Sequence, residues 1–202
     1  MMKLTLDGRE LKTGAYDGRT LSQVIDGVEK DLAPERVIVA MSLNGEPLDR
    51  AEEKRSGAVP VDELVSLEIR SQKVNSLALD TLHTLIEYFP QLEGNTYRCI
   101  ETLQGNDESE GHRRLGVLID GLQMVSSAWH GISRFLEFDD RKPTDVMPDM
   151  SEFNLLLNDI LNAQQNNDVV QICDLLEFEL IPIIQNWADY AAGLVNASAA
   201  SN

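Results

Sequence analysis

Basic side chains are scarce in this sequence. Lysine and arginine total 17 against 34 aspartate and glutamate residues, so the formal net charge at pH 7 is −17. Proteins that bind nucleic acid or anionic membranes need basic patches, and an acidic chain is repelled by both. We therefore expect no nucleic-acid partner and no membrane partner.

Cysteines and long apolar runs are scarce as well. Cys99 and Cys173 both fall inside apolar helical patterns, which favours buried free thiols over a disulfide or a reactive pair. The N-terminus lacks the apolar run of a signal peptide, and no apolar stretch approaches the roughly 18–20 residues of a membrane span. We expect a cytoplasmic protein.

Charge and apolar periodicity divide the sequence into two parts. Residues 1–73 hold 11 basic and 14 acidic side chains, whereas residues 74–202 hold 6 and 20. Near residue 74 the apolar pattern also changes from the alternation of strands to the period of helices. We predict an α+β chain with a docking domain at 1–73 and an acidic helical bundle at 74–202.

The first domain is predicted to be a small sheet with one helix. Thr20 and Gln23 have the spacing of a capping box, which begins the helix, and Pro34 ends it. Alternation and turn signals predict four strands: 3–6, 9–16, 37–43 and 64–70. This order of elements resembles the β-grasp, or ubiquitin-like, fold. Ubiquitin-like carriers end in an exposed Gly-Gly, whereas this strand continues into a helix, so the resemblance implies docking rather than carrier chemistry.

The second domain is predicted to contain four helices. They cover 75–104, 108–137 and 152–165, and the last begins after Asp168. Short turns join the helices in pairs and an acidic linker at 138–150 joins the pairs, so we predict an antiparallel four-helix bundle of two αα-hairpins. In the last helix, Pro182 predicts a kink.

The helix at 108–137 carries two apolar strips on different faces. The core strip is Leu115, Leu118, Leu122, Val125, Trp129, Ile132 and Leu136. The outer strip is Val117, Gly121, Met124, Ala128, Gly131 and Phe135. One strip suffices for joining a bundle, so the outer strip requires a second partner: the first domain, another copy of the chain, or another protein. Leu175 and Phe178 likewise point away from the apolar stripe of the last helix and face the same alternatives.

No group of residues specifies a chemical reaction. A di-iron site in a bundle needs two Glu-x-x-His motifs, and the sequence offers only Asp80 followed by His83. Glu177 and Glu179 lie on different sides of a helix and do not converge on a substrate. We therefore predict no catalytic residues, no cofactor and no metal.

The last hairpin resembles flagellar-type secretion chaperones, small helical bundles that hold flagellin subunits. The resemblance is carried by Ile160-Leu161-Asn162-Ala163, Asn167-Asp168, Ile172, Asp174-Leu175-Leu176-Glu177, Glu179-Leu180 and Trp187. It implies a cytoplasmic bacterial protein whose apolar helix faces bind a helical segment of another protein. That family does not usually carry a β-grasp domain in front.

The function predicted from the sequence is therefore non-enzymatic protein binding, chaperone-like or adaptor-like, in bacterial motility or secretion. The predicted partner-binding residues are Val117, Gly121, Met124, Ala128, Gly131, Phe135, Leu175 and Phe178. One alternative is a homodimer in which the outer strip is structural and the function lies in the N-terminal domain. Another is an enzyme with a site between the domains.

Overall fold

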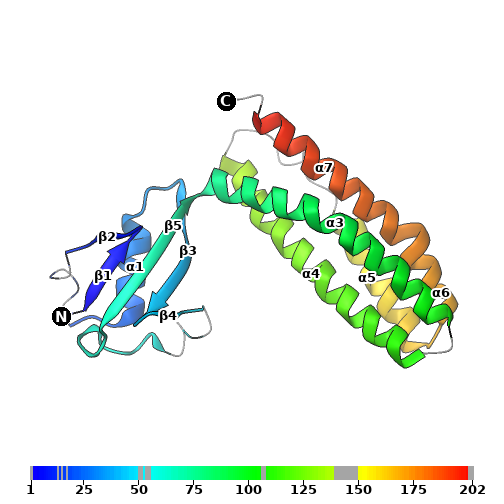
Figure 1. Cartoon of the computed structure of the whole chain (residues 1–202), viewed down its shortest axis with the longest axis horizontal. Helices are drawn as coiled ribbons and strands as arrows, with labels where there is room; N and C mark the ends of the chain where they lie inside the picture. Colours follow the sequence, from blue (N-terminus) through cyan, green and yellow to red (C-terminus); the bar gives the residue numbers. More distant parts are fainter. Residues whose placement is uncertain are drawn as a thin grey trace. The chain divides into compact units, whose positions relative to one another are not determined.

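The computed structural model describes residues 2–12, 14, 16, 18–49, 52, 56–105, 108–138 and 150–199, without the side chains of residues 108 and 134–138. Within these residues the chain is α+β, with a five-stranded sheet followed by long helices (Figure 1). The chain divides into two compact units, Met1–Leu77 and Ala78–Asn202. We call them the sheet unit and the helical unit.

The sheet unit has the strand order β2-β1-β5-β3-β4. Its strands are β1 (Lys3–Leu6), β2 (Arg9–Glu10), β3 (Arg36–Leu43), β4 (Glu46–Pro47) and β5 (Ser66–Lys73). The central strands β1 and β5 are parallel, and the other neighbouring strands are antiparallel. The sequence predicted a longer second strand, which is confined to Arg9–Glu10, and it did not predict β4. A short 3-10 helix, η2 (Val61–Glu63), precedes β5.

Helix α1 (Leu21–Asp31) covers one face of the sheet. The predicted capping box is confirmed: the Thr20 N–H donates to Gln23 Oε1, and the Gln23 N–H donates to Thr20 Oγ1. Such reciprocal bonds satisfy N–H groups that the first turn of a helix leaves without partners. The core of the unit contains Leu4, Leu21, Val24, Ile25, Val28, Leu67 and Ile69.

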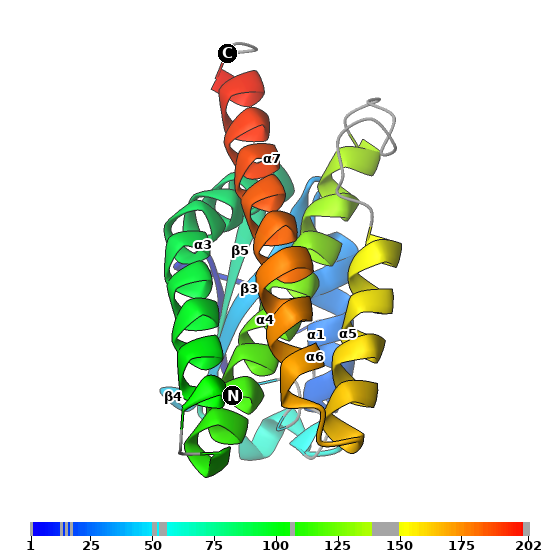
Figure 2. The ribbon, with the colours of Figure 1, turned by 90° about the vertical axis from the view of Figure 1, so that its right-hand side faces the viewer.

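The helical unit has a bundle-like arrangement. Its elements are α3 (Val74–Gln104), α4 (Glu108–Phe138), α5 (Met150–Gln165), α6 (Val169–Asp174), the π-helical segment η4 (Leu175–Leu180) and α7 (Ile181–Ala199). Figures 1 and 2 show α3 and α7 side by side, and Gln185 Nε2 of α7 donates to Glu93 Oε1 of α3 at 2.8 Å. The buried ring of Trp187 lies 4.8 Å from that of Phe153 in α5 and 6.5 Å from that of Phe89 in α3. These aromatic contacts join three of the helices in one core.

Near Pro182, where the sequence predicts a kink, the segment from α6 to α7 contains a π-helical stretch. In η4 the Ile181 N–H donates to the Leu176 carbonyl, five residues back. This wider turn comes just before Pro182, which lacks an N–H and cannot continue the α-helical bonding. The widening shifts the buried face by one residue: Ile184 is buried, whereas Ile183, which would continue the α-helical period of Leu176 and Leu180, is only half-buried.

Within the described part of the chain, the helices are all too short or too polar to span a membrane.

Candidate functional site

The core strip of α4 forms the interior of the helical unit. Its described members, Leu115, Leu118, Leu122, Val125, Trp129 and Ile132, are all buried. The side chain of Leu136 lies outside the described residues. The inner face of α4 is therefore occupied by the chain's own helices, and any further contact must use another face.

The outer strip of α4 is open to solvent at several positions. Val117 and Met124 expose 56% and 55% of their surface, and Gly131 is also exposed. Ala128 is half-buried, and the side chain of Phe135 lies outside the described residues. Because Val117 and Met124 are seven residues apart, they lie on one side of the helix two turns apart.

Gly121 belongs to the interface between α3 and α4 rather than to the open surface. A Cβ atom at this position would lie 2.5 Å from Tyr88 Oη and 3.3 Å from Leu92 Cδ1. The missing side chain thus makes room for the tip of Tyr88. Gly121 is buried by the chain itself and is not available to a partner. The exposed part of the outer strip is therefore smaller than predicted.

Leu175 and Phe178, predicted to share an exposed face, are separated by the π-helical geometry of η4. Leu175 is buried, with 8% of its surface exposed, whereas Phe178 exposes 67%. In η4 the five-residue step from Leu175 to Leu180 places both leucines in the interior. An ideal α-helix does not predict this separation, and the sequence signal that could have found it is Pro182.

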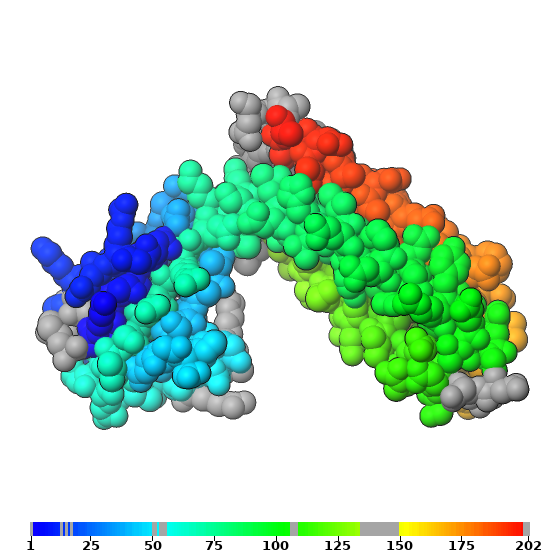
Figure 3. All heavy atoms as spheres, in the orientation of Figure 1, coloured from blue at the N-terminus to red at the C-terminus, as the bar shows by residue number. Residues whose placement is uncertain are grey.

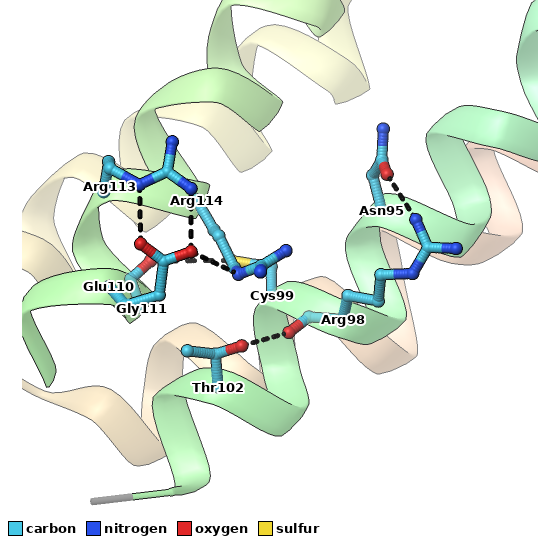
Figure 4. Close-up of polar contacts among 8 residues, drawn as sticks. All are labelled: Asn95, Arg98, Cys99, Thr102, Glu110, Gly111, Arg113 and Arg114. Atoms are coloured by element: carbon cyan, nitrogen blue, oxygen red, sulfur yellow. Dashed lines mark hydrogen bonds and ion pairs between the residues drawn. The ribbon is translucent and has the colours of Figure 1, made fainter. Parts of the chain in front are cut away.

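The turn between α3 and α4 is bordered by a polar cluster (Figure 4). Glu110 accepts hydrogen bonds from Arg113 Nε at 2.6 Å and Nη2 at 2.7 Å, and Arg114 Nε lies 2.9 Å from Glu110 Oε1. These contacts, first the hydrogen bond from Arg113, hold the pKa of Glu110 below its ordinary value. Asp107 and Glu110 have the spacing of an N-cap and its reciprocal partner, but Asp107 lies outside the described residues.

A second polar cluster ties three strands of the sheet together. Asp7 accepts from the Ser71 N–H at 2.7 Å, from the Ser71 hydroxyl at 2.8 Å and from Arg36 Nη2 at 2.8 Å. These contacts, led by the Ser71 N–H, lower the pKa of Asp7. The cluster borders a hollow of about 700 Å³ on the sheet, lined by Lys3, Thr5, Asp7, Gly8, Val39, Glu68, Ile69, Arg70, Ser71 and Gln72. Charges of both signs line this hollow, so it selects no single class of charged ligand.

Among the residues that the structure describes, no three histidine, cysteine, aspartate or glutamate side chains are placed to hold a metal ion. Cys99 and Cys173 are free and buried. Burial, followed by the charge effect of Cys173, raises the pKa of Cys99 to about 11. Both thiols therefore remain protonated near neutral pH, a state that disfavours nucleophilic attack.

Comparison with known proteins places the helical unit in a family. Neither the search of curated proteins nor the search of solved structures gave a match. Residues 80–190, from α3 to α7, match one family model. The chain belongs to the family described as domain of unknown function (DUF8042).

Proposed function

We propose that this protein is a non-enzymatic protein-interaction module, chaperone-like or adaptor-like, that binds a helical segment of a partner on the outer face of α4. The observation that carries the proposal is the exposure of Val117 and Met124 on a helix whose described core strip is already buried by the chain itself. Exposed apolar residues two turns apart suit the docking of an amphipathic helix, which presents its own apolar side chains at the same spacing.

The finer architecture belongs to the same proposal. The helical unit is an antiparallel four-helix bundle of two αα-hairpins, and the sheet unit is a β-grasp docking domain. The bundle is supported by the turn at 166–168, where Asp168 Oδ1 accepts the Gln171 N–H at 2.9 Å and caps α6. The β-grasp is supported by the strand order, with parallel β1 and β5 at the centre and a helix on one face.

The resemblance to flagellar-type secretion chaperones supports a role in bacterial motility or secretion. The Asn167-Asp168 turn precedes a capped helix, and Trp187 lies in the core, as a bundle of that type requires. In this proposal the protein is cytoplasmic, uses no cofactor and holds its partner through apolar contact.

The test compares two arginine substitutions in the full chain. Met124→Arg places a charge on the outer strip, and Val65→Arg places the same charge on the sheet unit, where Val65 exposes 73%. Each tagged protein is used as bait in native-host lysate, and retained proteins are identified by mass spectrometry. We expect a partner that the wild type and Val65→Arg retain and that Met124→Arg loses, with unchanged circular dichroism. Retention of the same proteins by all three baits contradicts the proposal.

A homodimer through the outer strip is the competing arrangement, and light scattering distinguishes it. Gly131 would allow close approach of a second helix, since a Cβ there meets no atom within 4 Å. If the wild type is a dimer and Met124→Arg is a monomer, the strip joins two copies and the proposal of a separate helical partner fails.

A further inference from the structure

Phe178 exposes an aromatic ring on the outer surface of the last hairpin. It exposes 67% of its surface, and Val170, two turns earlier, exposes 72%. The steps from Val170 to Asp174 and from Asp174 to Phe178 are four residues each, so these three side chains share one face. The orange segment in Figure 3, which contains α6 and η4, lies at the surface of the helical unit.

The backbone of η4 keeps Phe178 outside. Leu175, Leu176, Leu180 and Ile181 are buried on the inner side of this wide turn. Phe178 lies in the sequence between the buried pair Leu175 and Leu176 and the buried pair Leu180 and Ile181. Its side chain is therefore on the outer side of the turn. Its exposure is therefore set by the helical geometry, and π-helical turns of this kind are frequent at functional sites.

The charged side chains of the segment that carries Phe178 are all acidic. From residue 151 onward the chain has no lysine, arginine or histidine, and its acidic residues are Glu152, Asp159, Asp168, Asp174, Glu177, Glu179 and Asp189. Asp174, Glu177 and Glu179 are exposed beside the ring. The negative charges also affect a buried group. Burial raises the pKa of the Cys173 thiol, and the carboxylates of Asp174 and Glu177 raise it further.

We propose that the acidic face, defined as Val170, Asp174, Glu177 and Phe178, docks a cationic amphipathic segment of a protein partner. This inference goes beyond the proposed function, because it adds a second docking surface, separate from the outer strip of α4, and the chemistry of its partner. Apolar contact with Phe178 and Val170 supplies affinity, and basic side chains on the segment pair with Asp174 and Glu177.

The same charges argue against other occupants of the acidic face. Two copies of this chain would bring like charges together, which costs binding energy. Nucleic acid and anionic lipid are repelled in the same way. A basic protein segment is the occupant that both the apolar and the charged parts of the face favour.

The experiment measures binding of synthetic helical peptides to the full chain by fluorescence anisotropy. The probe is an amphipathic peptide of leucine and lysine, compared with matched peptides in which glutamine or glutamate replaces lysine. Phe178→Ser removes the ring, and Tyr97→Ser is the matched control, an aromatic on α3 that exposes 47%. We expect the lysine peptide to bind the wild type and Tyr97→Ser with equal affinity. Its affinity for Phe178→Ser should be lower by about tenfold.

A charge variant tests the electrostatic part separately. The pair Asp174→Asn and Glu177→Gln keeps the ring but removes two negative charges, and Glu87→Gln with Glu101→Gln removes two exposed charges from α3 instead. We expect the first pair to weaken binding several-fold and to reduce its dependence on salt, because it removes the partners of the lysines. Equal binding by the two pairs overturns the proposal, as does equal binding of the lysine and glutamine peptides.

Met124→Ser separates this inference from the proposed function. Weaker binding by Phe178→Ser with unchanged binding by Met124→Ser supports docking on the acidic face. If Met124→Ser weakens binding and Phe178→Ser does not, the acidic face is wrong and the outer strip of α4 stands as the docking site. If neither substitution changes binding of any peptide, both proposals fail.

Discussion

The two proposed hairpins of the helical unit, α3 with α4 and α5 with α6 to α7, differ in the charges that they carry and in their backbone geometry. The α3–α4 hairpin has close helix contacts at Gly111 and Gly121, and its Glu110 pairs with Arg113 and Arg114. Both hairpins bury large aromatics, Phe89 and Trp129 in the first and Phe153 and Trp187 in the second. The hairpin from α5 to α7 contains a π-helical turn and, from residue 151 onward, no basic residue. The exposed apolar groups of the second hairpin therefore lie in a segment whose charged residues are all acidic, whereas α4, which carries Val117 and Met124, has three basic residues against four acidic ones.

The aromatic core of the second hairpin gives the largest expected effect. Trp187→Ala would remove a ring that contacts Phe153 and Phe89, leaving a cavity between three helices. We expect the free energy of unfolding to fall by about 3–5 kcal/mol, measured by urea denaturation followed by circular dichroism. A loss below about 1 kcal/mol would mean that this hairpin does not depend on its aromatic core.

Glycine packing in the first hairpin gives the next effect. A Cβ at Gly111 would lie 2.8 Å from Leu103 Cδ2 and 3.2 Å from Leu103 Cα. Because the backbone of α3 must move, we expect Gly111→Ala to lower the free energy of unfolding by about 1–3 kcal/mol.

Gly116→Ala is the control on the same helix. A Cβ there meets no atom within 4 Å, so alanine should stabilise α4 by about 0.5–1 kcal/mol through its higher helix propensity. Both substitutions are compared by the same urea denaturation. If both change the free energy of unfolding in the same direction, the first hairpin does not depend on the close approach of its helices.

The ion pairs of the first hairpin give a smaller, pH-dependent effect. The folded-state pKa of Glu110 is lowered, chiefly by the hydrogen bond from Arg113. Its stabilisation is therefore present above the ordinary glutamate pKa and is lost as the pH falls through the lower folded-state value. We expect Glu110→Gln to reduce the thermal midpoint slightly at neutral pH and not at strongly acidic pH. An equal difference at both pH values would contradict the assignment.

The thiols give the smallest expected effect, one in each hairpin. Cys99 in α3 and Cys173 in α6 are buried, and burial raises the pKa of both thiols. We expect neither to react with iodoacetamide in the native protein near neutral pH, and both to react in urea, as read by mass spectrometry. Rapid native labelling of Cys173 alone would show that the second hairpin opens more readily than the first.

Local signals predicted much of the fold. The Thr20 capping box, the core strip of α4 and the cap at Asp168 follow from residue spacing, and the structure contains all three. Two residues of β4 are too few to give a periodic signal. The buried position of Ile184 follows from the π-helical turn, whose five-residue bonding breaks the constant period on which the prediction depended.

The candidate surfaces were predicted less completely than the fold. The spacing of residues along one helix does not show which of them a neighbouring helix covers. Gly121 and Met124 lie on one strip of α4, yet Gly121 faces Tyr88 and Met124 faces solvent. The size of Tyr88, on a different helix, decides which part of the strip is covered. The separation of Leu175 from Phe178 likewise depends on backbone bonding in η4 rather than on side-chain type.

The parallel pairing of β1 with β5 affects the order of folding. It joins residues 3–6 to residues 66–69, and Asp7 adds hydrogen bonds to Ser71. Contacts between residues so distant in the chain form slowly, whereas helical hairpins consist of near neighbours and form fast. During synthesis β1 cannot pair with β5 until β5, the strand directly before α3, has also been made. We therefore expect the sheet unit to set the slowest step in folding of the whole chain.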